Sequence, residues 1–342
     1  MRFGPVPVGE AEGLIAAHSV RVGPVVIRKG RTITAEDVAG LRRAGAETVV
    51  AVGLDPGDVG EDEAAHLLAL VAAGGNVRVE RPFTGRANLF ACLPGLLVVE
   101  AGGVDRLNGV DEAVTLATLA DSKPVVAGEM VATVKIIPYA VAGAALAEAL
   151  HLAGGGLLRV APYRRRRVAV ISTLTAALKA GVVAKTLRAL ADRLAPAGAA
   201  ITAAVEIAHE APALRDALRA AAADADLVVV FGASAIADRR DVIPAALEAA
   251  GGEVVHLGMP VDPGNLLMVG RLGGVPVIGA PGCARSPAEN GFDWALRRLI
   301  ADLPVTREEV TRLGVGGLLM EIVSRPQPRG GGEAEGEAGG EG

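Results

Sequence analysis

The chain has 342 residues, a length that suits two domains, and 51% of them are hydrophobic. Aromatic residues make up only 2% of the sequence, so we expect a core built from Ala, Val, Leu and Ile. A net charge of −5 argues against a nucleic-acid-binding protein, which would need a basic face. The two cysteines provide no disulfide framework and suit a reducing compartment. No apolar segment has signal-peptide or membrane-spanning character, so the sequence predicts a soluble, cytoplasmic protein that does not enter membranes.

Residues 1–162 carry strand and helix signals that predict a smaller mixed α/β domain. A helix is expected from Thr34 to Ala44, because Thr34 and Asp37 have nearly the spacing of a capping box. Apolar runs and helical periodicity predict the other elements. The further helices are expected at 60–73 and 105–119, and the strands at 48–54, 96–100, 125–127 and 131–139.

Two basic features of this first domain have open interpretations. The segment 81–89 contains Arg81, Arg86 and Asn88 and is predicted to be a polar loop, either an anion site or, more ordinarily, a solvated turn. Lys135 lies inside an apolar strand. Its aliphatic part can be buried while its ammonium group reaches solvent, and a phosphate contact is the alternative.

The segments Gly154–Gly156 and Arg164–Arg167 mark the predicted boundary with a second domain at 163–323. Four consecutive arginines are more typical of a charged linker than of a nucleic-acid site. Past residue 330 only Gly, Ala and Glu occur, a composition that cannot bury apolar surface. We therefore expect 324–342 to be a disordered tail.

The second domain alternates strands and helices, which predicts an α/β fold with a doubly wound parallel sheet. The strands are expected at 168–171, 201–207, 227–231, 253–257 and 275–278, and the helices at 183–194, 212–223, 242–247 and 292–303.

Three loops in this domain follow apolar strands, at 232–241, 259–265 and 281–287. Parallel strands end at the same edge of a sheet, so the loops should gather at the usual ligand crevice of an open α/β fold. Small residues in the first loop allow close backbone approach, and the helix after Asp241 begins there. Backbone N–H groups at such a helix N-terminus favour a phosphate.

These loops resemble the molybdopterin-binding domain shared by molybdopterin adenylyltransferases and molybdopterin molybdenumtransferases, which has a MoaB/Mog-like fold. The resemblance covers about Arg167 to Ile322 and rests on a set of motif residues. They are Gly232-Ala233-Ser234, Asp238, Asp241, Pro263-Gly264-Asn265 and Pro281-Gly282. Segments 290–294 and 314–322 resemble a branch often joined to a nucleotidyltransferase domain, so the chain looks like a stand-alone relative of molybdenum cofactor cytidylyltransferase fusions.

The resemblance and the residue types together suggest site residues. Asp238 and Asp241 are the candidates for catalysis, and Asp238 also for Mg²⁺, because carboxylates hold Mg²⁺ beside substrate phosphates. Asp241 is in addition expected to cap its helix. The candidate residues for binding molybdopterin are Ser172, Thr173, Gly232, Ala233, Ser234, Asp262, Pro263, Gly264, Asn265, Pro281, Gly282, Arg285 and Ser286.

The chain departs from the related pattern in two places. Loop 259–265 lacks the lysines that molybdenumtransferases often carry there, so we expect an arginine to hold the phosphate, with Arg285 as first choice. The other candidate cations are Arg239, Arg240 and Arg271. Segment 172–175 lacks the acidic pair linked to molybdate insertion, which makes that chemistry less secure than pterin binding.

Three functional interpretations remain open. The chain assists metal insertion or nucleotide attachment at the pterin phosphate, or it carries the pterin to a separate cytidylyltransferase without catalysis. The third is a nucleotide-processing enzyme that resembles competence-damage proteins. We also expect a homo-oligomer. Cys283 is interpreted as a packing residue, because neither a second cysteine nor His209 or His256 lies near it in sequence.

Overall fold

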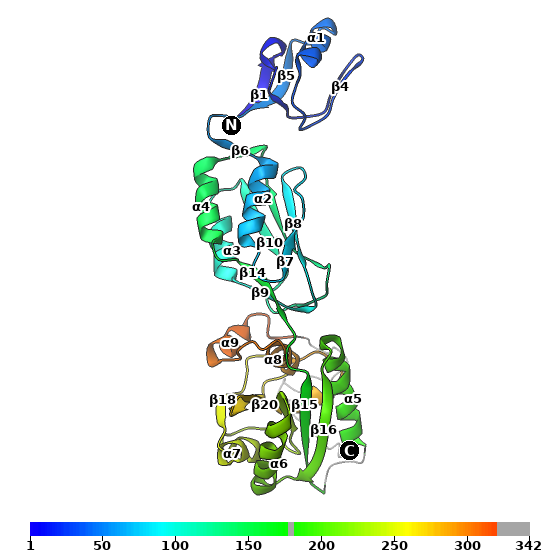
Figure 1. The fold of residues 1–342 in the computed structure, drawn as a ribbon, viewed down its shortest axis with the longest axis vertical. Helices are drawn as coiled ribbons and strands as arrows, with labels where there is room; N and C mark the ends of the chain where they lie inside the picture. The colour runs from blue at the N-terminus through cyan, green and yellow to red at the C-terminus, as the bar shows by residue number, and fades with distance from the viewer. Residues whose placement is uncertain (177–180, 320–342) are drawn as a thin grey trace, which may run out of the picture. The chain divides into compact units, whose positions relative to one another are not determined.

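The computed structural model describes residues 1–176 and 181–319, and the chain forms two compact units, Met1–Arg164 and Arg165–Gly342 (Figure 1). The division falls next to the boundary expected from the sequence. The tail predicted at 324–342 lies outside the described residues. Over the described ranges, none of the helices combines the length and apolar character needed to cross a membrane.

The first unit begins with a three-stranded antiparallel sheet in the order β1-β5-β2. It is accompanied by the hairpin β3–β4 and helix α1, and its core includes Ile27, Ile33 and Leu41. Thr34 and Asp37 form the predicted capping box at the start of α1. The bounds are β1 Arg2–Pro7, β2 Ile15–Ala16, β3 Val20–Val22, β4 Val25–Ile27, α1 Ala35–Arg43 and β5 Thr48–Gly53, with a 3-10 helix at Val8–Glu10.

The rest of the first unit has its own core, in which helices α2 and α4 pack with a four-stranded sheet of order β10-β12-β8-β7. A three-stranded sheet, β11-β9-β14, and the pair β13-β6 complete it. The bounds are β6 Asp58–Gly60, α2 Glu61–Ala72, β7 Val77–Val79, β8 Arg86–Ala91, β9 Gly95–Val99, α3 Ala101–Asn108, β10 Val114–Thr118, β11 Pro124–Val125, β12 Met130–Ile136, β13 Ala140–Ala142, α4 Gly143–Ala153 and β14 Leu158–Pro162.

Two sequence expectations for this unit were wrong. The helix predicted at 105–119 ends at Asn108, and Val114–Thr118 is a strand. Val114 and Leu116 are buried there while Thr115 and Ala117 are not, and this period-two alternation is the strand signal that was missed. The loop predicted at 81–89 becomes strand from Arg86 onward for the same reason, since Ala87 and Leu89 face the core.

Lys135 is a structural residue, which was the first of its two interpretations. Its Nζ donates to the carbonyl of Thr84 at 2.6 Å and lies 3.5 Å from a carboxylate oxygen of Glu61. The ammonium group is thus partnered by protein groups of the same unit.

The second unit is built on a six-stranded sheet of order β16-β15-β17-β20-β19-β18. The pairs β16/β15, β15/β17 and β17/β20 are parallel, whereas β19 runs antiparallel to both its neighbours. The bounds are β15 Arg167–Leu174, α5 Val182–Leu194, β16 Ala200–Ala208, α6 Ala211–Asp224, β17 Leu227–Phe231, α7 Val242–Ala249, β18 Glu253–Leu257, β19 Met268–Leu272, β20 Val275–Ala280, α8 Gly291–Ile300 and α9 Arg307–Thr311, with 3-10 helices at Ala195–Ala197, Gly282–Arg285 and Arg312–Gly314.

Strand β19 was not predicted, although the sequence carries its signal. Gly273 and Gly274 form the two-residue connection of a hairpin in which Leu272 lies opposite Val275. Gly273 has φ +58°, a conformation that glycine adopts without strain. A Gly-Gly pair between two apolar runs therefore indicated an antiparallel strand in an otherwise parallel sheet.

Helices cover both faces of this sheet, as a doubly wound fold requires. Leu214 and Leu218 of α6 and Leu247 of α7 belong to a core that includes the alternate strand residues Val228 and Val230. On the other face, the ring of Phe231 packs 6.2 Å from the ring of Phe292 in α8. The fold class predicted for this unit is confirmed.

Candidate functional site

The three loops predicted to form a crevice all leave the same edge of the six-stranded sheet. Strands β15, β17 and β20 end in register, with Ser172 opposite Phe231 and Phe231 opposite Ala280. The loop after β18 begins at this edge too, because β18 runs in the direction of β20 on the far side of antiparallel β19. The sheet register therefore brings the loops together at the carboxyl edge, where open α/β sheets bind ligands.

A chain of hydrogen bonds links the ends of β15 and β16 to the first loop. Thr173 Oγ1 lies 2.7 Å from His209 Nδ1, and His209 Nε2 lies 3.0 Å from Ser234 Oγ. Thr173 Oγ1 also accepts the N–H of Ala233 at 2.9 Å. His209 was not among the predicted site residues, because it was considered only as a possible partner of Cys283. Its position directly after a predicted parallel strand was the available signal.

The first loop is held by its own carboxylates. Asp241 accepts the N–H groups of Ala237 and Asp238 at 2.6 and 2.8 Å, and Asp238 pairs with the guanidinium of Arg240 at 2.7 Å. Hydrogen bonds from Arg240 lower the pKa of Asp238. Asp241 occupies the N-cap position of α7, but its side chain makes no capping hydrogen bond, so that expectation was wrong. The carboxylate turns back to the loop, where two N–H groups lie within reach.

The described residues offer few ligands to a metal ion. Among them, no group of three or more His, Cys, Asp and Glu side chains is arranged to hold a cation. The carboxylate of Asp238 already faces Arg240, whose positive charge opposes a nearby Mg²⁺. The structure thus gives no support to Asp238 as a magnesium ligand.

The second loop is fixed against the start of α8. Gly264 has φ +138°, and a Cβ added there would lie 2.6 Å from the backbone nitrogen of Gly291, so only glycine fits. The N–H of Gly291 donates to the carbonyl of Pro263 at 2.9 Å. The N–H of Asp262 donates to the carbonyl of Gly317 at 2.8 Å. These bonds set the position of the Pro-Gly-Asn segment before any ligand binds.

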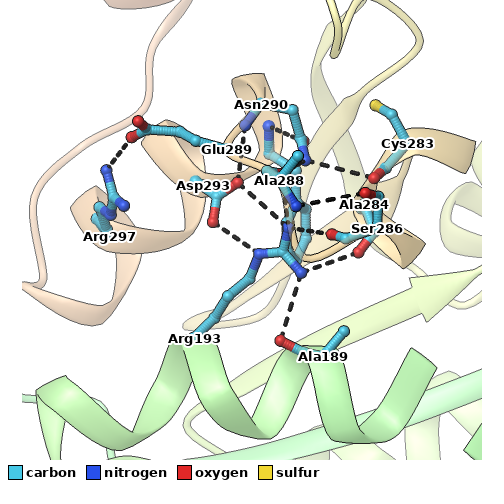
Figure 2. A network of polar contacts seen from close by, with 11 residues as sticks. Ala189, Arg193, Cys283, Ala284, Ser286, Ala288, Glu289, Asn290, Asp293 and Arg297 are labelled. Atoms are coloured by element: carbon cyan, nitrogen blue, oxygen red, sulfur yellow. Dashed lines mark hydrogen bonds and ion pairs between the residues drawn. The ribbon is translucent and has the colours of Figure 1, made fainter. Parts of the chain in front are cut away.

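The third loop is organised by Arg193 of α5 (Figure 2). Its guanidinium pairs with Asp293 of α8 at 2.7 Å, and both side chains are buried, with 8% and 6% exposure. It also donates to the carbonyls of Ala284, Ser286 and Ala288 at 3.1, 2.6 and 3.2 Å. This role of Arg193 could not be predicted from the sequence, because a charged residue in an amphipathic helix ordinarily faces water.

Asn290 connects this loop to α8. Its side chain accepts the N–H of Phe292 at 3.1 Å and donates to the carbonyl of Ala288 at 3.0 Å. Asp293 returns the contact by accepting the N–H of Asn290 at 2.9 Å, which completes a capping box. Asp293 therefore serves the helix cap and the ion pair with Arg193 at once.

We predict that Arg193→Ala destabilises the second unit by about 3–5 kcal/mol, since it leaves the Asp293 carboxylate buried without its partner. Trp294, the sole tryptophan of the chain, lies in α8, so its fluorescence during urea unfolding of the full chain reports on this unit. The matched control is Arg297→Ala, which breaks the exposed pair with Glu289 and should cost less than about 1 kcal/mol. Equal losses in the two variants would contradict the prediction.

Arg285 joins the third loop to the first. Its guanidinium donates to the carbonyl of Gly232 at 2.9 Å and to Thr186 Oγ1 of α5 at 3.0 Å. The group stacks 5.3 Å from the centre of the Phe231 ring, and burial lowers its pKa. Arg285 is thus half-buried at the base of the loops.

The other candidate cations are placed less favourably. Arg271 lies toward the end of antiparallel β19, at the opposite edge of the sheet, and pairs with Glu253 at 2.6 Å. It was wrong as a crevice candidate, because the antiparallel strand had not been recognised. Arg239 donates to the carbonyl of Val254 at 3.3 Å, and Arg240 faces Asp238.

The exposure of the predicted ligand-binding residues divides them into three groups. Those exposed are Ser234, Asn265, Gly282 and Ser286, those partly buried are Gly232, Ala233, Asp262, Pro263 and Arg285, and those buried are Ser172, Thr173, Gly264 and Pro281. A buried side chain cannot touch a ligand in the open crevice directly. Thr173 instead contacts His209 and the N–H of Ala233 within the protein.

Cys283 lies in the third loop and is partly buried. Burial is the largest influence on its thiol and raises its pKa. A thiol with a raised pKa is protonated at neutral pH, which opposes a nucleophilic role.

We expect Cys92, which is exposed, to react with a disulfide reagent such as DTNB faster at pH 7 than Cys283. Only the thiolate reacts, so the reaction rate of Cys283 should continue to rise at pH values above about 8.5, the ordinary pKa of a cysteine thiol. Reaction of the Cys92→Ser variant isolates the slow thiol. A fast reaction of that variant at pH 7 would refute the protonated, packed state of Cys283.

Comparison with known proteins assigns the second unit to a family. Residues 169–301 match the model of the family described as a probable molybdopterin binding domain, and this segment is a domain of that family. Residues 5–52 match a family described as a domain of unknown function, DUF8806. No curated protein matches the sequence.

Solved structures of molybdenum cofactor proteins are similar to the chain. A molybdopterin biosynthesis MoeA protein from Pyrococcus horikosii is 16% identical, with a TM-score of 0.32 over 88% of this chain and 75% of its own. A molybdenum cofactor biosynthesis protein B is 17% identical, with a TM-score of 0.30 over 41% of this chain and 96% of its own. These identities and scores are low, so neither structure assigns a role to any residue.

Proposed function

Because residues 169–301 are a domain of the molybdopterin-binding family, we propose that the second unit binds molybdopterin at the carboxyl edge of its sheet, as a step of molybdenum cofactor biosynthesis. The observation that carries the proposal is the convergence of the three loops at this edge, with Arg285 bridging two of them. The pterin phosphate lies at the first and third loops, and the second loop contacts the rest of the ligand.

Arg285 and Ser234 are the groups proposed to hold the phosphate. A guanidinium carries five N–H donors, and two of those of Arg285 are used by Gly232 and Thr186. Within residues 1–176 and 181–319 its other donors have no further hydrogen-bond partner, so they can donate to an anionic oxygen, to which charge-assisted hydrogen bonds are strong. Ser234 adds a hydroxyl at the exposed surface of the first loop. The N–H of Ala233 is not available, because it donates to Thr173.

Assistance in metal insertion or nucleotide attachment at the bound phosphate remains the first proposed role. A second candidate, a non-catalytic carrier that passes the pterin to a separate nucleotidyltransferase, is favoured by one observation. The carboxylates of Asp238 and Asp241 are both engaged within their own loop. Incubation of the pterin-loaded protein with nucleotide triphosphates and molybdate, each with Mg²⁺, separates the two roles. Turnover supports the first, and release only to an added nucleotidyltransferase supports the second.

We predict that Arg285→Ala weakens molybdopterin binding about tenfold to a hundredfold, since a hydrogen bond to a charged group contributes about 1.5–3 kcal/mol. Pterin fluorescence released from the purified protein on denaturation, or calorimetry under anaerobic conditions, measures the loss. It should shrink at high salt if the contact is partly exposed.

Arg271→Ala is the matched control, because it removes an arginine of the same domain at the opposite edge of the sheet. Arg285→Lys keeps the positive charge but removes the guanidinium that donates to the carbonyl of Gly232. It therefore distinguishes a loss of phosphate binding from a loss of the hydrogen bond that holds the first loop. Unchanged affinity in a folded Arg285→Ala variant would exclude Arg285 from the phosphate site. If neither wild type nor any variant retains a pterin, the proposed function itself is wrong.

A further inference from the structure

Thr173, His209 and Ser234 form a line from the buried end of a strand to the surface of the crevice. Thr173 is fully buried, with 0% exposure, His209 is partly buried and Ser234 is exposed. The spacing is similar to that of a Ser-His-Asp triad, with 3.0 Å from Ser234 Oγ to His209 Nε2 and 2.7 Å from His209 Nδ1 to the third member. In a triad, however, the third member accepts a hydrogen bond from Nδ1–H, and Nε2 accepts the serine proton.

The third member here is a hydroxyl, and its surroundings reverse the direction of the bonds. Thr173 Oγ1 already accepts the N–H of Ala233 at 2.9 Å. Its own proton needs an acceptor, and full burial keeps it from bulk water. Over the residues that the structure describes, the acceptor in reach of this hydroxyl is His209 Nδ1. Leaving the buried hydroxyl without one is unfavourable, so Thr173 donates to Nδ1.

An uncharged imidazole ring whose Nδ1 accepts a hydrogen bond carries its own hydrogen on Nε2. That Nε2–H then donates to Ser234 Oγ. Because Nε2 carries a hydrogen, the serine hydroxyl cannot donate a hydrogen bond to it, so the serine O–H points away from His209. Ser234 is exposed, so the direction that remains for its O–H is toward the crevice.

We propose that Ser234 is a binding hydroxyl and not a nucleophile, directed into the crevice as a hydrogen-bond donor by His209 in its Nε2–H form, with Thr173 fixing that form. The group that Ser234 recognises must be a hydrogen-bond acceptor, which is an anionic oxygen of a phosphate. This second part rests on the proposed function, whereas the form of the ring does not. His209 and Thr173 are positioning residues, since they act on the ligand through Ser234.

The form of the imidazole is measurable in the ligand-free full chain. The protein has five histidines, so His209→Gln assigns the ring signals in a nitrogen-15 NMR spectrum. At a pH where the ring is uncharged, we expect a protonated Nε2 and an unprotonated Nδ1. Thr173→Val should shift this pattern and Thr173→Ser should restore it, which a merely structural role would not do. A protonated Nδ1 in the wild-type protein would overturn the proposal.

Reactivity tests the same proposal from the serine side. A fluorophosphonate labels serines that can pass their proton to histidine, and we expect no labelling of Ser234. Modification of Ser234, abolished in His209→Gln, would overturn the assignment.

Ligand binding is tested by calorimetric titration of each variant with inorganic phosphate, and in the variants that keep His209 the NMR signals of the ring report on the same site. We expect Ser234→Ala to weaken binding about tenfold or more. His209→Gln should bind within a few-fold of the wild type, because its amide N–H can replace Nε2–H. His151→Gln, in the first unit, is the control for the loss of a histidine.

The outcomes separate the two proposals. An Nε2–H ring with full phosphate affinity in Ser234→Ala overturns the donor role of Ser234, while the phosphate site itself survives. An Nε2–H ring without any phosphate response supports the hydrogen-bond chain and counts against the proposed function instead.

Discussion

The buried ion pair between Arg193 and Asp293 is the interaction on which the crevice depends. A buried charge is tolerated only when it is paired and fully hydrogen-bonded, and Arg193 satisfies its donors with the carbonyls of the third loop. The third loop therefore takes the shape that places its carbonyl oxygens around the buried guanidinium (Figure 2). Because Asp293 also caps α8, the start of that helix and the second loop, which packs on Gly291, are fixed by the same pair.

The first loop is built on a different principle, since its polar groups satisfy one another. Asp241 accepts two N–H groups, Asp238 holds Arg240, and Thr173 takes the N–H of Ala233. In the proposed binding mode, Ser234 and Arg285 supply the donors for a ligand. A site of this kind is suited to holding an anion in place, because preorganised donors need no rearrangement when the charge arrives.

Much of the second unit could be predicted because its signals are local. Runs of Val and Ile bounded by Gly gave the parallel strands, and helical periodicity gave α5, α6 and α8. The errors have local causes too. Residues 114–118 alternate as a strand does but were predicted as helix, and Gly273-Gly274 marks a hairpin whose first strand was assigned to no element. The predicted position of Arg271 was therefore wrong, since antiparallel β19 ends at the edge of the sheet where the parallel strands begin.

The sequence by itself determined the fold class and the loops that form the crevice, because strand order along the chain and the handedness of βαβ connections leave few alternatives. The family of residues 169–301 was indicated by the resemblance of the loop motifs. Only the tertiary structure decided which side chains serve those loops. Arg193 is separated from Asp293 by 100 positions, and His209 from Thr173 and Ser234 by 36 and 25. Hydrogen bonds and ion pairs act over a few ångströms of space, so the partners of a polar group are fixed by how the strands and helices pack and not by spacing in the sequence.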